Sequence, residues 1–204
     1  MTDVTEYWER KILRWEEARY SRARNPMSWS VRARLHQAEK IIRERTTFST
    51  RILELGCGSG LLGEKLRGHI EKFFGIDIAQ NAILRAVNRV PEFSFAVGNV
   101  LTATFPKADL TVFLGLTDWL DESGMELLFS KVTSRSILFS YTHASPWNPY
   151  RLYRIYTDMP NTQRARTWTS HRIHDLLERN GYRGETLVQP YLLNPGALVW
   201  AKKK

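Results

Sequence analysis

The segment LELGCGSGLLG, residues 53–63, constrains the fold of this chain more than any other part of its sequence. Four glycines fall within eight residues, directly after the short apolar run RILEL. Glycine lets a backbone turn sharply and leaves no side chain between that backbone and a bound molecule. The residues that follow have a helix-like pattern, so the segment indicates a strand, a glycine loop and a helix. We therefore expect a loop that closely approaches a nucleotide.

Strand-like and helix-like segments alternate through much of the chain. Helical patterns separate most of the apolar, strand-like runs, which occupy 51–55, 72–78, 93–100, 108–116 and 136–142. Such alternation implies right-handed crossovers and a parallel sheet, and runs that are apolar on both faces suit a sheet covered on both sides. A helical pattern at 169–181, for which Thr169 or Ser170 is the expected N-cap, then leads to two final strands separated by the turn NPG. The predicted fold class is therefore α/β, with seven strands, a mostly parallel sheet, helices on both faces and a C-terminal antiparallel hairpin.

Residues 1–45 precede this alternation and have helical patterns of their own. The first segment mixes aromatic and charged residues, and NPMS interrupts it before a second helix, for which Ser28 or Ser30 is the expected N-cap. A stripe at helical spacing predicts that this second helix packs on a core: Val31, Leu35, Ala38 and Ile42. We expect an N-terminal helical segment or lid over 1–45 and a nucleotide-binding domain over 46–204.

Residues 144–168 interrupt the alternation with a segment rich in proline, arginine and aromatic residues. Aromatic side chains stack on rings or sugar faces, and arginines bind phosphates or carboxylates. One prediction is that this insert covers a flat or cyclic, anionic substrate, and the alternative is an amphipathic helix that buries its aromatic side chains. The residues concerned are Trp147, Tyr150, Tyr153, Tyr156 and Trp168, with Arg151, Arg154, Arg164 and Arg166.

Length, charge and cysteine content narrow the class of protein. The 204 residues suit one domain with a sizeable core. A net charge of +9 suggests an anionic partner, such as a nucleic acid, a phosphorylated or carboxylated small molecule, or a membrane surface in peripheral contact. No apolar run approaches the roughly 18–20 residues of a membrane span. Cys57 is the one cysteine, and the N-terminus is acidic and aromatic rather than like a secretory signal, so we expect a cytoplasmic protein.

The glycine loop matches two nucleotide-binding patterns. Gly58, Gly60 and Gly63 fit G-x-G-x-x-G, the fingerprint of dinucleotide-binding oxidoreductases. The other pattern is E-x-G-x-G-x-G, which starts at Glu54. Asp77 ends the second strand 19 residues beyond Gly58, where both patterns use an acidic side chain to hold ribose hydroxyls. The glycines and Asp77 alone therefore leave both nucleotides open.

The second pattern, LELGCGSG with its acidic residue inside the strand, resembles the first motif of class I S-adenosylmethionine (SAM)-dependent methyltransferases. The short chain around it and the terminal hairpin are also similar to that family, over roughly residues 30–204. The resemblance implies a Rossmann-like fold with SAM as cofactor, with Asp77 on the ribose and Ile78 on the adenine. It implies further cofactor contacts at Glu54, Gly56, Cys57, Gly58, Gly60, Asn99, Val100, Leu114, Gly115 and Leu116. The family commonly has an acidic residue where Asn99 stands, and the Asn99 carbonyl can accept the same hydrogen bond.

Methyl transfer is an in-line displacement that must align the acceptor atom and, for a hydroxyl acceptor, remove a proton. Asp118, in the loop after the fourth strand, is the first candidate for a base or hydroxyl acceptor. His143, at the end of the fifth strand, is the second, because an imidazole titrates near neutrality. Tyr20 is expected to close over the site if the N-terminal segment is a lid. Each has a structural alternative: a helix cap, a surface histidine and a packing tyrosine. No metal site is expected from the histidine spacing.

Two loose resemblances bear on the acceptor. The segments RWEEARYSRA, LGLTDWLDE and ILFSYTHASPWNPYRLYRIY are similar in order to magnesium-protoporphyrin O-methyltransferases, which have a histidine where Asp118 stands. The opening YWERKILRWEEARYS resembles small methyltransferases of bacterial glycan and natural-product pathways. The N/D-P-P-Y motif of amino-methylating DNA enzymes is missing after the fourth strand, which disfavours nucleic acid as the partner.

The sequence therefore predicts a biosynthetic enzyme, a SAM-dependent O-methyltransferase that acts on a small anionic or glycan-type acceptor. Candidate acceptors are a nucleotide-linked sugar or another saccharide. The alternatives are a porphyrin carboxylate O-methyltransferase, a NAD-type oxidoreductase and a non-catalytic nucleic-acid-binding module.

Overall fold

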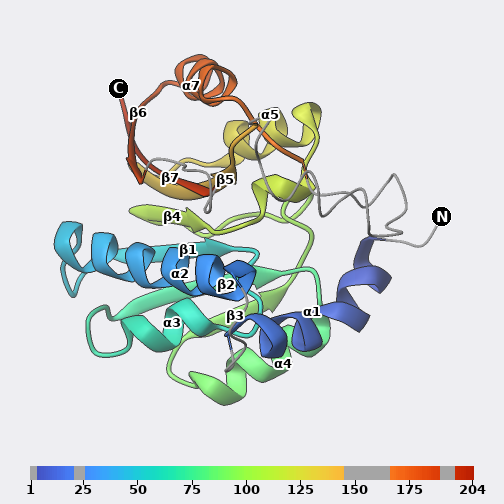
Figure 1. Cartoon of the computed structure of the whole chain (residues 1–204). Coiled ribbons are helices and arrows are strands. Elements are labelled where there is room, and N and C mark those ends of the chain that lie inside the picture. The colour runs from blue at the N-terminus through green and yellow to red at the C-terminus, as the bar shows by residue number, and fades with distance from the viewer. Residues whose placement is uncertain (1–3, 21–25, 145–165, 189–195) are drawn as a thin grey trace.

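The computed structural model describes residues 4–20, 26–144, 166–188 and 196–204 (Figure 1). Seven strands form one sheet in the order β3-β2-β1-β4-β5-β7-β6. β1 to β5 pair in parallel, whereas β7 is antiparallel to both β5 and β6, so the predicted sheet and its terminal hairpin are confirmed. The strands are β1 (Arg51–Leu55), β2 (Lys72–Asp77), β3 (Ser94–Val97), β4 (Leu110–Phe113), β5 (Ser136–Thr142), β6 (Tyr182–Val188) and β7 (Gly196–Lys203).

Helices cover the sheet on both faces, as predicted. The helices are α1 (Val4–Tyr20), α2 (Pro26–Arg45), α3 (Leu61–Leu66), α4 (Gln80–Arg89), α5 (Glu122–Lys131) and α7 (Ser170–Arg179), with a short 3-10 turn, η1 (Thr117–Trp119). The two N-terminal helices differ, because α2 packs on the sheet and α1 lies beside α4. In Figure 1, α2 and α3 lie in front of the central strands and α1 runs beside α4. Within the described ranges, no helix is long and apolar enough to cross a membrane.

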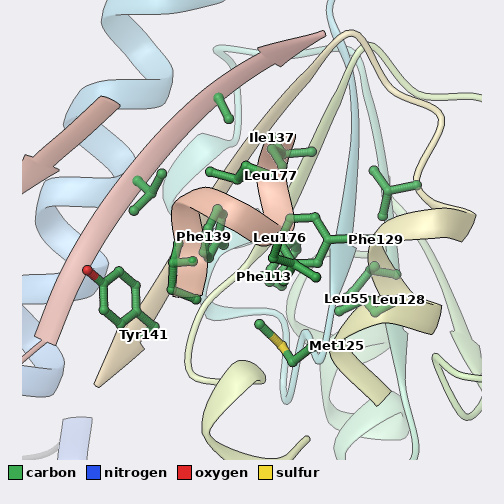
Figure 2. Packing of buried hydrophobic residues seen from close by; sticks show 14 of the residues in the cluster. Leu55, Phe113, Met125, Leu128, Phe129, Ile137, Phe139, Tyr141, Leu176 and Leu177 are labelled. Carbon is green, nitrogen blue, oxygen red and sulfur yellow. The ribbon is translucent and has the colours of Figure 1, made fainter. Parts of the chain in front are cut away.

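Successive residues of the central strands face two separate cores. Leu53 and Leu55 of β1 pack with the side chains of α5 and α7, whereas Ile52, one residue before Leu53, packs with those of α2 and α3. This follows from the alternation of side chains along a strand. Figure 2 shows the first core, where Phe113, Phe139 and Ile137 from the strands meet the helices through Met125, Leu128, Phe129, Leu176 and Leu177. Every central strand is therefore buried on both faces, which explains its continuous apolar run.

Two predicted helix caps have different outcomes. Thr169 caps α7, and its hydroxyl accepts a hydrogen bond from the Arg172 amide at 3.3 Å, as expected. The predicted cap of α2 is wrong, because that helix begins at Pro26 and therefore contains Ser28. Proline suits the first turn of a helix, where its missing N–H leaves no bond unmade. The Ser28 hydroxyl instead donates to the Ala18 carbonyl at 3.1 Å, which ties α2 to the end of α1.

The strand order positions the ligand site. β1 lies between β2 and β4, so the chain winds outward in one direction through β2 and β3 and in the other through β4 and β5. The loops that leave the carboxyl ends of β1 and β4 therefore diverge, and the crevice between them is where open α/β sheets bind ligands. The glycine loop follows β1, and Leu114 to Trp119 follow β4.

Candidate functional site

A cavity of about 470 Å³ opens at this crevice, under a roof made by α1 and α2. Its size is within the 300–1,000 Å³ range typical of small-molecule sites. Most of the predicted site residues line it together: Tyr20, Glu54, Gly56, Cys57, Gly58, Asp77, Ile78, Asn99, Val100, Leu114, Gly115, Leu116 and Asp118. Gly60 and His143 are not among its lining residues in the described part of the chain. The predicted residues thus lie on the floor of one cavity, whereas the sequence predicted the roof only as an N-terminal lid.

The glycine loop has a backbone that other residues rarely adopt. Gly56, Gly58 and Gly60 have φ angles of 71°, 51° and 76°, in the left-handed region. A side chain on Gly60 would also meet the Ala86 Cβ at 3.1 Å, so this glycine lets the loop lie against α4. Gly63 is a buried residue inside α3, where an added Cβ would lie 3.3 Å from the Phe73 ring. Its role is helix packing, as the methyltransferase-like pattern requires.

Every amide of the loop from Gly56 to Gly60 already donates to an acceptor within the protein. The acceptors are the Ile76 carbonyl for Gly56 and Cys57, the Asp77 carboxylate for Gly58, the Glu16 carboxylate for Ser59, and the Cys57 carbonyl for Gly60. A dinucleotide loop needs free amides for a pyrophosphate. This loop presents carboxylates instead, which favours a ligand that carries positive charge.

Three buried carboxyl groups surround the loop. Glu16, Glu54 and Asp77 are each less than a tenth exposed, and burial is the main cause that raises the pKa of each one. The pKa of Glu54 is raised furthest above its ordinary value, and the charges of Asp77 and Glu16 add to that increase. Glu54 Oε2 has no hydrogen-bond partner among the described residues. A buried unpaired oxygen of this kind indicates a ligand that donates hydrogen bonds or carries positive charge.

Asp77 is held rigidly at the end of β2. Its Oδ2 accepts from the Gly58 amide at 2.8 Å and its Oδ1 from the Ala79 amide at 3.0 Å. These bonds leave lone pairs on both oxygens for ribose hydroxyls. Asn99 lies on the same side of the cavity, and its Oδ1 accepts from the Leu101 amide at 2.9 Å, which is a turn-forming contact.

Besides the Glu16 contact with Ser59, the roof helix α1 meets the domain at three further places. Ile12 is buried in an apolar cluster with Ala79 and Ala82 of the β2–α4 region. The Glu9 carboxylate accepts from the Asn81 amide at 3.0 Å, near the start of α4. At the other end of the cavity, Trp8 packs edge-on against Trp119, with ring centroids 4.7 Å apart. The predicted lid segment therefore lies directly over the site.

Arg34 of α2 is a site residue that sequence reasoning missed. Its guanidinium lies against Gly115, where an added Cβ would be 3.0 Å from Nη1. It hydrogen-bonds the Tyr20 side chain, and its charge acts on the Asp118 carboxyl group. Nothing in the sequence distinguished Arg34 from the many other arginines of the N-terminal segment. The one sequence feature that could have pointed to Arg34 is its spacing on α2, one helical turn from the predicted core residue Val31.

The Asp118 side chain is half-buried and accepts hydrogen bonds from two threonines, the longer one from the Thr117 hydroxyl at 3.5 Å. Thr142 donates to Asp118 from its amide at 3.0 Å and from its hydroxyl at 2.9 Å. Burial is the main cause that raises the pKa of Asp118, and the Arg34 charge opposes that rise. The Arg166 amide donates to the Asp118 carbonyl at 2.6 Å, which places Arg166 at the same end of the cavity. The two base candidates thus differ in position. Asp118 lines the cavity, whereas His143 does not and forms a backbone β-bridge with Trp168.

The remaining site predictions concern cysteine, metals and the insert. Cys57 is buried, and burial raises the pKa of its thiol well above the ordinary value, so it is no nucleophile at neutral pH. No cluster of metal-ligating side chains occurs in the described ranges. Of the predicted substrate cover, only Arg166 and Trp168 are described, and the remaining aromatic and arginine residues of 145–165 lie outside the described residues.

Comparisons with known proteins agree with this geometry. Residues 52–135 match the family model described as a methyltransferase domain. These residues of the chain carry a methyltransferase domain. A comparison with curated protein sequences gives no match. This match favours the glycine pattern that begins at Glu54 over the dinucleotide pattern.

Solved structures share the fold of this methyltransferase domain. One is magnesium protoporphyrin IX methyltransferase (ChlM) from Synechocystis PCC 6803 with bound SAH, at 17% identity and a TM-score of 0.79, covering 98% of each chain. A TehB-like SAM-dependent methyltransferase from Corynebacterium glutamicum has 19% identity and a TM-score of 0.64, covering 97% of this chain and 98% of that one. The small RNA methyltransferase HEN1 has 17% identity and a TM-score of 0.68, covering 85% of this chain and 25% of that one.

Proposed function

We propose that this methyltransferase transfers the methyl group of SAM to an oxygen of a small, anionic, ring-bearing or glycan-type acceptor. The observation that carries the proposal is the acceptor end of the cavity, where aromatic and basic side chains meet. Tyr7, Trp8 and Trp119 pack together there, and Arg166 lines the same end. Aromatic rings offer stacking surfaces to flat rings and sugars, and arginine binds phosphate or carboxylate.

The residues around the loop fit SAM. Its ribose hydroxyls suit the fixed Asp77 carboxylate, and its positively charged groups suit Glu54, whose Oε2 has no partner in the described chain. Arg34 lies on the Gly115 side, where it supports binding of the carboxylate of the methionine part. When bound, SAM supplies a methyl group on a sulfonium, ready for in-line displacement.

Asp118 is proposed as the group that orients an acceptor hydroxyl and takes its proton. It lines the cavity, and Thr142 fixes its orientation through two hydrogen bonds. Burial raises its pKa, which makes the carboxylate a better proton acceptor than an exposed aspartate. Tyr20 stands close by, hydrogen-bonded to Arg34, and would help close the site.

A porphyrin carboxylate is the second candidate acceptor. A carboxylate needs no base, and Arg166 supports binding of such a group at the acceptor end. The likeness to ChlM spans nearly the whole of both chains, and it supports the shape of the site rather than its substrate. We also propose that nucleic acid is not the acceptor and that the protein is cytoplasmic, which the single buried cysteine supports.

The test is a product assay with SAM and four acceptor classes: sugar nucleotides, free saccharides, a porphyrin dicarboxylate and short RNA. Mass spectrometry of the products would show the added methyl group. We expect methylation of a sugar-type hydroxyl and none of RNA. Methylation of RNA, with salt-sensitive binding, would contradict the proposal.

Variants at the two base candidates sharpen the same assay. At saturating SAM, we expect Asp118→Asn to lower turnover of a hydroxyl acceptor by about 10²-fold or more, because the amide cannot take the proton. His143→Ala is the comparison, and we expect turnover near that of the natural protein because His143 does not line the cavity. If Asp118→Asn turns over normally, the base assignment is wrong, and a carboxylate acceptor is favoured.

A further inference from the structure

Glu16 connects the roof helix α1 directly to the glycine loop. Its side chain is buried, and its Oε1 accepts from the Ser59 amide at 2.9 Å while its Oε2 accepts from the Ser59 hydroxyl. Glu16 lies well outside residues 52–135, the part of the chain that matches the family model. This contact is therefore an addition of the N-terminal segment to the domain.

The Glu16 carboxylate occupies the ligand-facing side of the loop. A side chain added to Gly58 would collide with Glu16 Oε1, so the glycine leaves room for this carboxylate. Both Glu16 and Glu54 line the cavity. Two acidic side chains thus approach the same part of the cavity, one from the strand below and one from the helix above.

These two carboxyl groups have unused hydrogen-bonding capacity. A carboxylate has about four acceptor sites, and Ser59 uses two of those on Glu16. Glu54 Oε2 has no partner in the described chain. The nearby cation Arg89 donates from Nη1 to the Ser59 carbonyl and hydroxyl, and its charge opposes the rise in the pKa of Glu16 that burial causes. The remaining acceptor sites of both carboxyl groups suit a positively charged donor.

We propose that Glu16 and Glu54 together bind the α-ammonium group of the SAM methionine part, so that α1 completes the cofactor site. An ammonium group has three N–H donors, which suits two carboxylates on opposite sides. Closure of α1 then depends on the amino-acid part of the cofactor, because the ammonium group bridges the roof helix and β1. The proposal rests on SAM as cofactor and is independent of the acceptor.

The test is calorimetric binding of three ligands: SAM, SAH and 5′-methylthioadenosine, which has the nucleoside but no amino-acid part. We expect Glu16→Gln to weaken SAM and SAH by about ten- to hundredfold, the loss of a charge-assisted hydrogen bond, and to leave methylthioadenosine unchanged. Glu17→Gln, at the adjacent exposed glutamate of the same helix, is the matched control and should bind all three normally. Glu54→Gln should show the same selective loss as Glu16→Gln.

Three results would overturn the proposal. Unchanged SAM binding by Glu16→Gln would show that the carboxylate does not contact the cofactor. An equal loss for all three ligands would show that Glu16 only holds α1 over the nucleoside. A natural protein that binds methylthioadenosine as tightly as SAH would show that the ammonium group contributes nothing. Failure of the natural protein to bind SAM at all is a separate result, and it would remove the cofactor assignment itself.

Discussion

At the scale of single residues, the site is governed by carboxyl groups that are buried before any ligand binds. Glu54, Asp77 and Glu16 lie around one loop, and burial raises the pKa of each. Removing a charged group from water is unfavourable unless a partner of opposite charge is present. The ligand-free protein therefore holds these acids at an energetic disadvantage, which a cationic ligand relieves. This is the physical reason why the loop suits SAM better than a pyrophosphate.

Because burial raises the pKa of Glu54, we expect this carboxyl group to release a proton when SAM binds. Its folded-state pKa is raised, so in the ligand-free protein it keeps a proton at pH values where an exposed glutamate has lost it. Its contribution to stability is therefore present at low pH and is lost as pH rises through the raised pKa. A bound cation favours the ionised form and lowers the pKa again. Between the two pKa values, binding releases a proton and SAM affinity rises with pH.

Calorimetry in buffers of different ionisation enthalpy measures this proton count. We expect release with SAM and SAH, less release in Glu54→Gln, and little with methylthioadenosine, which lacks the ammonium group. Equal proton release in the natural protein and Glu54→Gln would assign the proton to another group.

Sequence analysis found the cavity-lining residues at the ends of strands and, apart from Tyr20, missed those on helices. Glu54, Gly58 and Asp77 stand at fixed positions relative to β1 and β2, so a short pattern locates them. Glu16 is 43 residues before Ser59, and its contact exists only because α1 folds back over the loop. Arg34 likewise reaches the cavity from α2. Such contacts depend on how helices pack in three dimensions, which no local spacing records.

At the scale of elements, α1 differs from the helices that cover the sheet. Among its described side chains, Ile12 and Glu16 are buried, and the apolar cluster around Ile12 is small. Elements with few buried apolar contacts open at low free energy. The glycine loop is the partner that holds α1 through Ser59, so the conformation of this loop and the docking of α1 should depend on each other.

Gly58→Ala tests this dependence, with Gly68→Ala as its matched control. Both glycines have positive φ angles, 51° and 73°, so alanine adds backbone strain of roughly 1–2 kcal/mol at either position. An added Cβ at 68 meets nothing within 4 Å, whereas at 58 it collides with Glu16. We expect hydrogen exchange across α1 to accelerate in Gly58→Ala and to stay unchanged in Gly68→Ala. Equal protection of α1 in both variants would show that the loop does not hold the helix.

The arrangement of the central strands was predictable because they are buried on both faces and their apolar runs alternate with helical patterns. The start of α2 was not, because Ser28 is a good capping residue that lies instead inside the helix and bonds to α1. The position of β7 between β5 and β6 was likewise open, since a hairpin pattern does not say which of its strands joins the sheet. Tertiary contacts decided both points.

At the scale of the whole molecule, two cores share one sheet. Adjacent residues of β1, β4 and β5 point alternately into the core with α5 and α7 and the core with α2 and α3. Neither core can be lost without removing the strands that support the other. The chain should therefore unfold as one unit, although it is longer than most proteins that do so.

One substitution in each core tests this cooperativity. Leu176→Ala and Leu66→Ala remove buried side chains from opposite faces and should each lower the free energy of unfolding by about 2–5 kcal/mol. The control Leu84→Ala, at a largely exposed residue, should change it by no more than about 0.5 kcal/mol. Trp168 lies in the first core and Trp200 in the second, so fluorine NMR of fluorotryptophan-labelled protein reports each core separately. Both signals should be lost at one denaturant concentration in every variant, because the strands couple the faces. If Leu66→Ala shifts the Trp200 transition alone, the two cores are independent folding units.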